Sequence, residues 1–135
     1  MRKPRRVRRK LLLTEGSSNR PLSKEELVTR KLYSLGFRRR YKGFFYLREE
    51  ILLAMDNEYK RITKLHEEVA LKHNKENPKK TIKPSNIESC IRVAIKGAWK
   101  EKKEKIQKLT GEKERPTVGR MVFEIARKMN NDKKL

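Results

Sequence analysis

The most regular helical pattern of the chain lies in the stretch PSNIESCIRVAIKGAWK, residues 84–100. Small and apolar side chains recur there at i, i+3, i+4, i+7 and i+11, the spacing of one helix face: they are Ile87, Cys90, Ile91, Ala94 and Ala98. Thr81 suits the N-cap and Pro84 suits the first turn, where its missing amide proton costs nothing. The stretch therefore predicts an amphipathic helix over about 84–100.

Helical patterns also precede this stretch. Ser23 followed three residues later by Glu26 is a capping-box pattern, and it opens a helix that Gly36 can close. The aromatic run FFYL, residues 44–47, leads into Ile51 at helical spacing, which predicts a second helix with the aromatic rings in the core. A third helix is expected over about 65–73, with a loop over 75–81 after it. A short β-hairpin over 42–46 stays open as an alternative.

The C-terminal part of the chain is predicted to be helical as well. Residues 100–108 are rich in charge, with Trp99 and Ile106 as inward anchors, and Gly111 breaks the pattern before Thr117 caps a last helix. The chain has no long alternation of apolar and polar residues, so no long strands are expected. The sequence therefore predicts an all-α bundle of five to six helices forming one domain over 21–135. A disordered, arginine-rich arm and linker is expected over 1–20.

The net charge of the 135 residues is +21, from 38 Lys and Arg against 17 Asp and Glu, and the excess is spread along the whole chain. Such a field attracts polyanions, so nucleic acid is the expected partner and an anionic membrane surface comes second. The first ten residues hold seven basic side chains and no acid. They are interpreted as a phosphate-binding arm, with a merely solubilising tail as the alternative.

The residues suited to catalysis or metal binding are few. One cysteine cannot form an intramolecular disulfide, and Cys90 with His66 and His73 cannot complete a structural zinc site. The acid pairs 49–50 and 67–68 point in different directions on a helix, so they are expected on solvated faces or in ion pairs. We expect no enzyme, no cofactor and no metal. Without a signal peptide or an apolar run of about 18 residues, a cytoplasmic protein that does not enter the membrane is expected.

The third and fourth helices are consecutive and basic, which favours a DNA-binding helix-turn-helix over about 65–100. On the polar face of the second of these helices, Asn86 suits adenine, Glu88 suits cytosine N4, and Arg92 suits guanine or phosphate. Backbone contacts are expected from Ser85, Ser89, Lys96, Lys79, Lys80, Lys83, Arg5, Arg6, Arg8 and Arg9. The alternative for Glu88 is an ion pair with Arg92 at i, i+4.

Four segments resemble a known family, in one order along the chain. They are GFFYLREEI at 43–51, ITKL with VALKHN within 62–74, the recognition-helix stretch at 85–99, and RPT at 115–117. They are similar to the DNA-binding effector domain of the sporulation master response regulator, stage zero sporulation protein A. The resemblance implies an all-α domain that binds a short promoter element and regulates transcription. It also implies DNA contacts from Ser85, Glu88 and Arg92, where the family's residue types are kept.

The chain departs from that family in three ways. The family usually has arginine at positions 86 and 89 and histidine at 93, so a different target sequence is expected. Ten residues separate Asn74 from Ser85, against a few in the family, and the added segment is rich in lysine. The basic arm stands where the family has a phosphorylated receiver domain, so aspartyl phosphorylation is not expected as the switch.

The sequence therefore predicts a sequence-specific, DNA-binding transcriptional regulator in the bacterial cytoplasm, associated with the nucleoid. Double-stranded DNA is the expected partner, and a dimer on DNA is one arrangement to test. The resemblance adds RNA polymerase as a partner for residues 100–114. Two alternatives remain: a basic RNA-binding or ribosome-associated protein, and a module that binds another regulator.

Overall fold

The computed structural model describes residues 22–57 and 61–133, and five helices account for most of them. They are α2 (Lys24–Ser34), α3 (Lys42–Asp56), α4 (Ile62–Glu76), α5 (Pro84–Thr110) and α6 (Val118–Lys133). No strand occurs in these ranges, so the prediction of an all-α bundle is confirmed. The alternative hairpin over 42–46 is wrong, because this segment forms the first turns of α3. The predicted arm over 1–20 lies outside the described residues.

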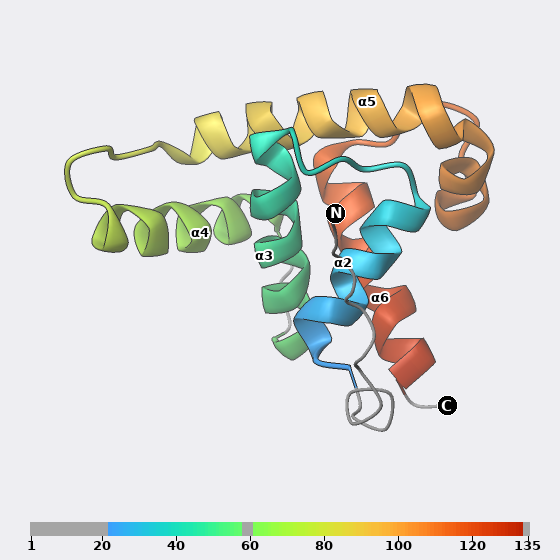
Figure 1. Ribbon diagram of the computed structural model, residues 1–135, viewed down its shortest axis with the longest axis horizontal. Coiled ribbons are helices and arrows are strands. Elements are labelled where there is room, and N and C mark those ends of the chain that lie inside the picture. Colours follow the sequence, from blue (N-terminus) through green and yellow to red (C-terminus); the bar gives the residue numbers. More distant parts are fainter. Residues whose placement is uncertain (1–21, 58–60, 134–135) are drawn as a thin grey trace, which may run out of the picture.

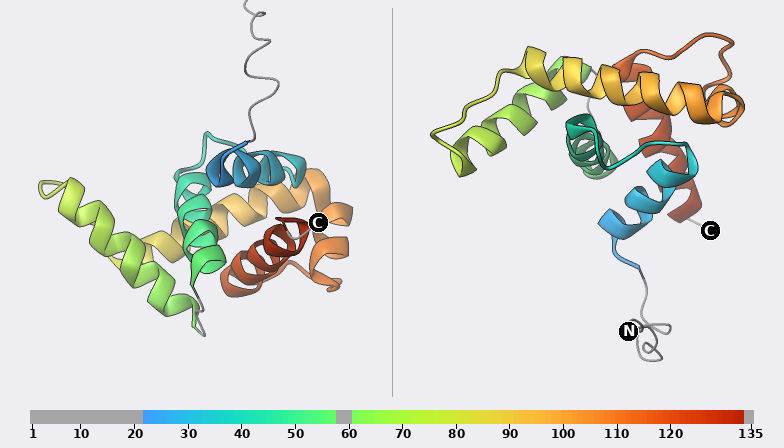
Figure 2. Two further views of the ribbon diagram at one scale, coloured as in Figure 1. Left: turned by 90° about the horizontal axis from the view of Figure 1, so that it is seen from below. Right: turned by 45° about the horizontal axis from the view of Figure 1, so that its top comes forward.

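Helix α3 is the centre of the bundle and contacts each of the other four helices (Figure 1). It buries Phe44, Leu47 and Ile51 completely, as the aromatic and apolar spacing predicts. Phe45, by contrast, points outward and is 39% exposed. α2, α3 and α6 gather beneath α5, while α4 extends away from them, as the two views in Figure 2 show. The α4–α5 loop is therefore far from the rest of the bundle.

The capping signals of the first and last helices are confirmed. The Ser23 amide donates to Glu26 Oε1 at 2.9 Å, and the Glu26 amide donates to Ser23 Oγ at 3.1 Å. Gly36 follows the end of α2 with a φ of +93°, which only glycine adopts without strain. At the other end of the chain, the Arg120 amide donates to Thr117 Oγ1 at 3.2 Å and caps α6.

Helix α4 is longer than predicted, and the loop after it lies two residues further along the chain than predicted. It begins at Ile62 and continues to Glu76, where the amide of the C-cap residue Asn77 donates to the His73 carbonyl at 2.8 Å. The loop therefore covers 77–83. This turn between α4 and α5 is still longer than the turn of a few residues in the family that the chain resembles. Asn74 clamps this loop, since its Oδ1 accepts from the Ile82 amide at 2.6 Å and its Nδ2 donates to the Ile82 carbonyl at 3.0 Å.

Helix α5 differs from its prediction at both ends. The N-cap is Lys83 and not Thr81, although Pro84 takes the first turn as expected. The helix does not stop near residue 100. It passes through a non-helical residue, Lys102 (φ −135°, ψ 46°), and ends at Thr110, where Gly111 has a φ of +74°. The charge-rich segment is thus an extension of α5 beyond a kink.

Candidate nucleic-acid interface

Helix α5 runs along the upper edge of the molecule in Figure 1, and the residues of its polar face are exposed. Five of the predicted contact residues are exposed on this face: Ser85, Asn86, Ser89, Arg92 and Lys96. Val93 lies among them and is 53% exposed. The opposite face is buried in the core, and there Ile95 is buried although the sequence analysis did not assign it to the core. One helix thus joins the core to a polar surface two to three turns long.

Asn86 has a structural task in addition to its predicted contact. Its Oδ1 accepts a hydrogen bond from the Lys83 amide at 3.1 Å, at the start of α5. A bidentate contact with adenine needs both the oxygen and the nitrogen of the amide group. The amide oxygen has two lone pairs, so the hydrogen bond from Lys83 fixes the orientation of the Asn86 side chain and leaves an acceptor site for a base.

Glu88 and Arg92 form the i, i+4 ion pair that the sequence analysis gave as an alternative to base contacts. Glu88 Oε2 accepts from Arg92 Nη2, and the two side chains are 38% and 59% exposed. An arginine carries five N–H donors in a planar fork, so this bond leaves others for a base or a phosphate. The pair therefore holds both groups in place beside the helix without removing them from the surface.

A buried acid–imidazole pair lies beneath this face and was missed by the sequence analysis. Glu50 of α3 is completely buried, and its Oε2 lies 2.5 Å from Nδ1 of His66 of α4, which is 3% exposed. Nε2 of the same imidazole lies 3.6 Å from Glu88 Oε1. Of the two alternatives expected for Glu50, the ion pair is the one that the structure shows, with the carboxyl group in the core and not on a solvated face. Glu50 follows Leu47, a core residue of α3, by three residues. This spacing was the sequence signal that Glu50 lies on the core face of the helix.

Burial is the largest influence on the pKa of the Glu50 carboxyl. It raises the pKa of Glu50 above its ordinary value, while the hydrogen bond and the charge of His66 act in the opposite direction. The nearby negative charge of Glu88 raises the pKa of Glu50 further. Its second oxygen, Oε1, is buried and has no hydrogen-bond partner. The two ionisable side chains are thus held in the core beside α5.

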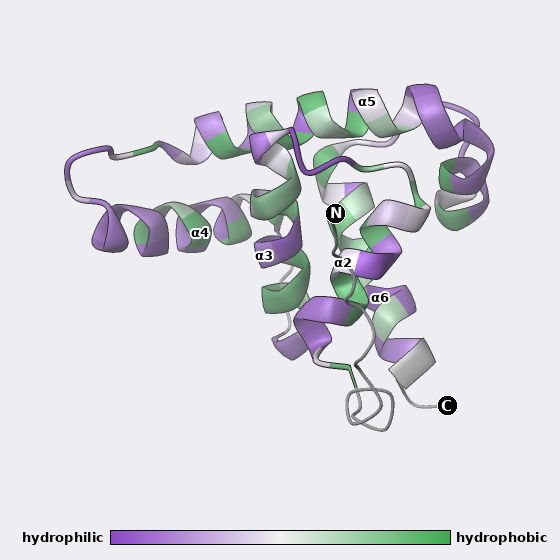
Figure 3. Ribbon diagram, in the orientation of Figure 1, coloured by the Kyte–Doolittle hydropathy of each residue, from purple (hydrophilic) through white to green (hydrophobic). Residues whose placement is uncertain are grey.

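The predicted loop cations lie at the far end of the α4–α5 pair. Lys79, Lys80 and Lys83 are all exposed, and Figure 3 shows this loop and the adjoining turns of α4 as largely hydrophilic. They stand beside the N-terminal end of α5, so the loop extends the surface that Ser85 begins. The remaining predicted contacts, Arg5, Arg6, Arg8 and Arg9, fall outside the described residues.

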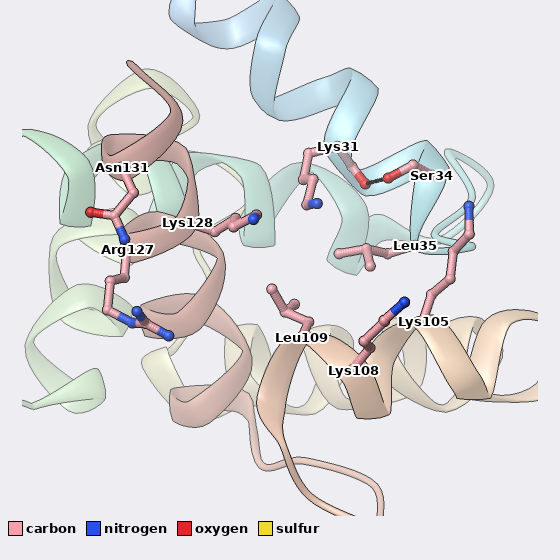
Figure 4. A pocket seen from close by; sticks show the side chains of 9 residues that line it. All are labelled: Lys31, Ser34, Leu35, Lys105, Lys108, Leu109, Arg127, Lys128 and Asn131. Carbon is pink, nitrogen blue, oxygen red and sulfur yellow. Dashed lines mark hydrogen bonds between the residues drawn. The ribbon is translucent and has the colours of Figure 1, made fainter. Parts of the chain in front are cut away.

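A basic pocket lies at the opposite end of α5. It is an open pocket of about 520 Å³ between α2, α5 and α6, shown in Figure 4. Its lining residues are Lys31, Ser34, Leu35, Lys105, Lys108, Leu109, Arg127, Lys128 and Asn131. Residues 86 and 105 are separated by roughly 25–30 Å of helix, so this pocket and the polar face of α5 are different surfaces.

Two features are absent from the described ranges, 22–57 and 61–133. No group of three or more His, Cys, Asp and Glu side chains is placed to hold a metal ion. None of the helices there is both long enough and apolar enough to cross a bilayer.

Comparison with known proteins gave one family match. The family model described as "Sporulation initiation factor Spo0A C terminal" matches residues 28–129, more than half of the chain. The match runs from α2 to α6 and includes the whole polar face of α5. No curated protein matches the chain.

Proposed function

The chain belongs to the Spo0A C-terminal family, a family of DNA-binding effector domains, and from this premise we propose that it is a sequence-specific regulator of transcription. The observation that supports the proposal best is the exposed polar face of α5, backed by a buried apolar face on the same helix. A helix in this arrangement lies in the major groove while its scaffold contacts the flanking phosphates. The regulator would act in the bacterial cytoplasm, on the nucleoid.

The residues divide into two groups by their chemistry. Asn86, Glu88 and Arg92 are proposed to read base edges, because amide, carboxylate and guanidinium groups distinguish base pairs in the major groove. Contacts with the DNA backbone are proposed for Ser85, Ser89, Lys96, Lys79, Lys80 and Lys83, and for the arm residues Arg5, Arg6, Arg8 and Arg9. In the proposed organisation, residues 1–20 are an arm that accompanies a DNA-binding domain over 21–135.

Residues 100–114 and the basic pocket are proposed as the surface for a protein partner. Lys105, Lys108 and Leu109 belong to both, and five cations surround two apolar side chains in the pocket (Figure 4). An acidic segment of RNA polymerase with an apolar anchor fits this chemistry. The pocket lies away from the polar face of α5, so DNA and the partner bind at the same time.

Selection of duplexes from a random DNA pool at about 150 mM salt tests the proposed function, because screening at this salt weakens purely electrostatic binding. A recovered half-site supports a sequence-specific regulator, and two half-sites one helical turn apart support a dimer on DNA. Recovery of no motif, with binding that disappears as salt rises, contradicts the proposal. Tighter binding to hairpin RNA than to duplex DNA would identify an RNA-binding protein instead.

The first prediction concerns base reading. Replacing Glu88 by alanine should lower discrimination at one base pair by about 1–3 kcal/mol, because the variant has no acceptor for cytosine N4 at this position. The measurement is the affinity for the selected duplex and for each of its single base-pair variants. Glu104→Ala, an exposed acid on the same helix beyond the kink, is the matched control. An equal change on every duplex would show that Glu88 reads no base.

The second prediction concerns the loop lysines. Lys79→Gln together with Lys80→Gln should weaken binding to all duplexes alike, because interactions with phosphates carry no sequence information. The slope of log K against log salt should fall by about 0.9 for each phosphate that the variant no longer neutralises. The control removes the same charge at the other end of α5, as Lys105→Gln with Lys108→Gln. Equal slopes in the two variants would mean that only net charge matters.

A further inference from the structure

We propose that the buried pair of Glu50 and His66 is a positioning element for Glu88, and that it sets the base preference at the position that Glu88 reads. The inference rests on the proposed function and extends it to residues that cannot touch DNA. Three helices contribute, since Glu50 lies on α3, His66 on α4 and Glu88 on α5. No residue of the buried pair belongs to the polar face itself.

The four side chains form a continuous row from the core to the surface. Glu50 Oε2 lies 2.5 Å from His66 Nδ1, and His66 Nε2 lies 3.6 Å from Glu88 Oε1. The other oxygen of Glu88 accepts from the Arg92 guanidinium. The exposed fraction rises along the row, from 0% for the side chain of Glu50 and 4% for His66 to 38% for Glu88 and 59% for Arg92. The imidazole is thus the only link in this row between the buried carboxylate and the surface pair.

The imidazole faces a carboxyl group on each of its two sides. A neutral imidazole carries one N–H, and the completely buried Glu50 draws it to Nδ1 because a hydrogen bond in low dielectric is strong. Nε2 then presents a lone pair to Glu88 and turns its carboxylate outward, towards Arg92. The hydrogen bond to Glu50 therefore settles which ring nitrogen state faces Glu88, and with it the orientation of the Glu88 carboxylate.

The charged neighbours of the imidazole indicate that Glu50 is the group that orients it. Among the described residues, the ion pairs of His66 are with Glu50 from α3 and Glu88 from α5. On its own helix, Lys64 pairs with Glu67, and both are exposed. His66 Nε2 is buried and has no hydrogen-bond partner, so its interaction with Glu88 Oε1 at 3.6 Å is electrostatic and not a hydrogen bond.

The chemistry of the pair argues against a purely stabilising role. Replacing a buried ion pair by apolar residues of similar volume is often neutral or stabilising, so the pair is a poor source of stability. A polar pair in the core, at the junction of α3, α4 and α5, can orient a neighbouring carboxylate, which a pair of leucine side chains could not do. It sets the position of one carboxylate on the recognition helix.

The test compares base preferences in variants that preserve size. With the duplex selected above and its single base-pair variants, binding is measured for the unmodified protein, Glu50→Gln, His66→Gln and Glu88→Gln. Both buried substitutions should lower discrimination about three- to tenfold, and only at the base pair where Glu88→Gln acts. Glu49→Gln, which changes the neighbouring acid that pairs with Lys72, is the matched control and should leave the preference unchanged.

A double-mutant cycle separates positioning from a general loss of structure. In the Glu88→Gln background, adding Glu50→Gln should have no further effect on base preference, because the group that it positions is gone. An equal weakening on all duplexes, or a change that persists in that background, overturns the inference. If the unmodified protein selects no motif, the proposed function fails and this inference fails with it. If a motif is found and Glu50→Gln leaves every preference unchanged, only the positioning role is overturned.

Discussion

Replacing Gly43 by alanine should lower the free energy of unfolding by about 3 kcal/mol and displace the recognition helix. α3 crosses α5 at this glycine, and a Cβ built on it would lie 2.1 Å from the Cys90 carbonyl oxygen and 2.8 Å from Ile91 Cα. These are backbone atoms in the middle of a helix, so no side-chain rotation relieves the overlap. Overpacking in a filled core costs about 1–3 kcal/mol or more, and a clash with backbone belongs at the upper end.

Urea denaturation measures the loss of stability, and DNA selection shows its consequence for function. Cys90 and Ile91 lie between Glu88 and Arg92 in the sequence of α5. A shift of this part of α5 should therefore move the side chains proposed to read bases, and weaken binding to the selected duplex. Gly119→Ala on α6 is the control, since the nearest atom to its Cβ is Ile62 Cβ at 3.3 Å. Equal stability losses at the two glycines would mean that the close crossing of α3 and α5 does not matter.

The sequence predicted those parts of the fold that depend on neighbouring residues. The capping box at Ser23, the cap at Thr117 and the helix end at Gly111 each need only a few residues of local context, and all are confirmed. The apolar face of α5 followed from its periodicity. The prediction of Thr81 as its N-cap is wrong, because in the structure Pro84 is the first residue of α5 and the Asn86 side chain accepts from the amide of Lys83.

The missed features depend on contacts between distant segments. Glu50 and His66 are 16 residues apart in sequence, and although the spacing from Leu47 places Glu50 on the core face of α3, neither helix alone shows which side chain it meets there. Only the crossing of α3 and α4 turns them into a buried pair. The kink at Lys102 was likewise hidden, since the charged run 100–105 gives no local sign that one helix continues through it. Helical periodicity predicted which residues of α5 face the solvent, but not that Glu88 contacts the core.

The remaining large effect is expected at this buried pair. Replacing His66 by leucine should lower the free energy of unfolding by about 3–5 kcal/mol at neutral pH, because the buried carboxyl of Glu50 then has no partner, and both ionisation in the core and uptake of a proton at this pH cost free energy. Adding Glu50→Met should restore most of the stability, since two apolar side chains of similar volume leave no charge in the core. Urea denaturation of the two variants beside the unmodified protein gives both values. A double variant as unstable as His66→Leu would show that packing, and not the missing partner, is the cause.

The pH dependence of the same two variants identifies the carboxyl group as the origin. Burial raises the pKa of Glu50 above its ordinary value of 4.5, and without His66 to oppose it the rise is larger. The folded state then binds this proton more tightly than the unfolded state does, so the contribution of Glu50 is fully favourable below pH 4.5 and is lost as pH rises through the raised pKa. The stability difference between His66→Leu and the double variant should therefore shrink as pH falls from 7 towards 4.5. Because all other titrating groups are shared by the two variants, a difference independent of pH would show that Glu50 binds its proton equally well in the folded and the unfolded state, and that its burial is not what destabilises the protein.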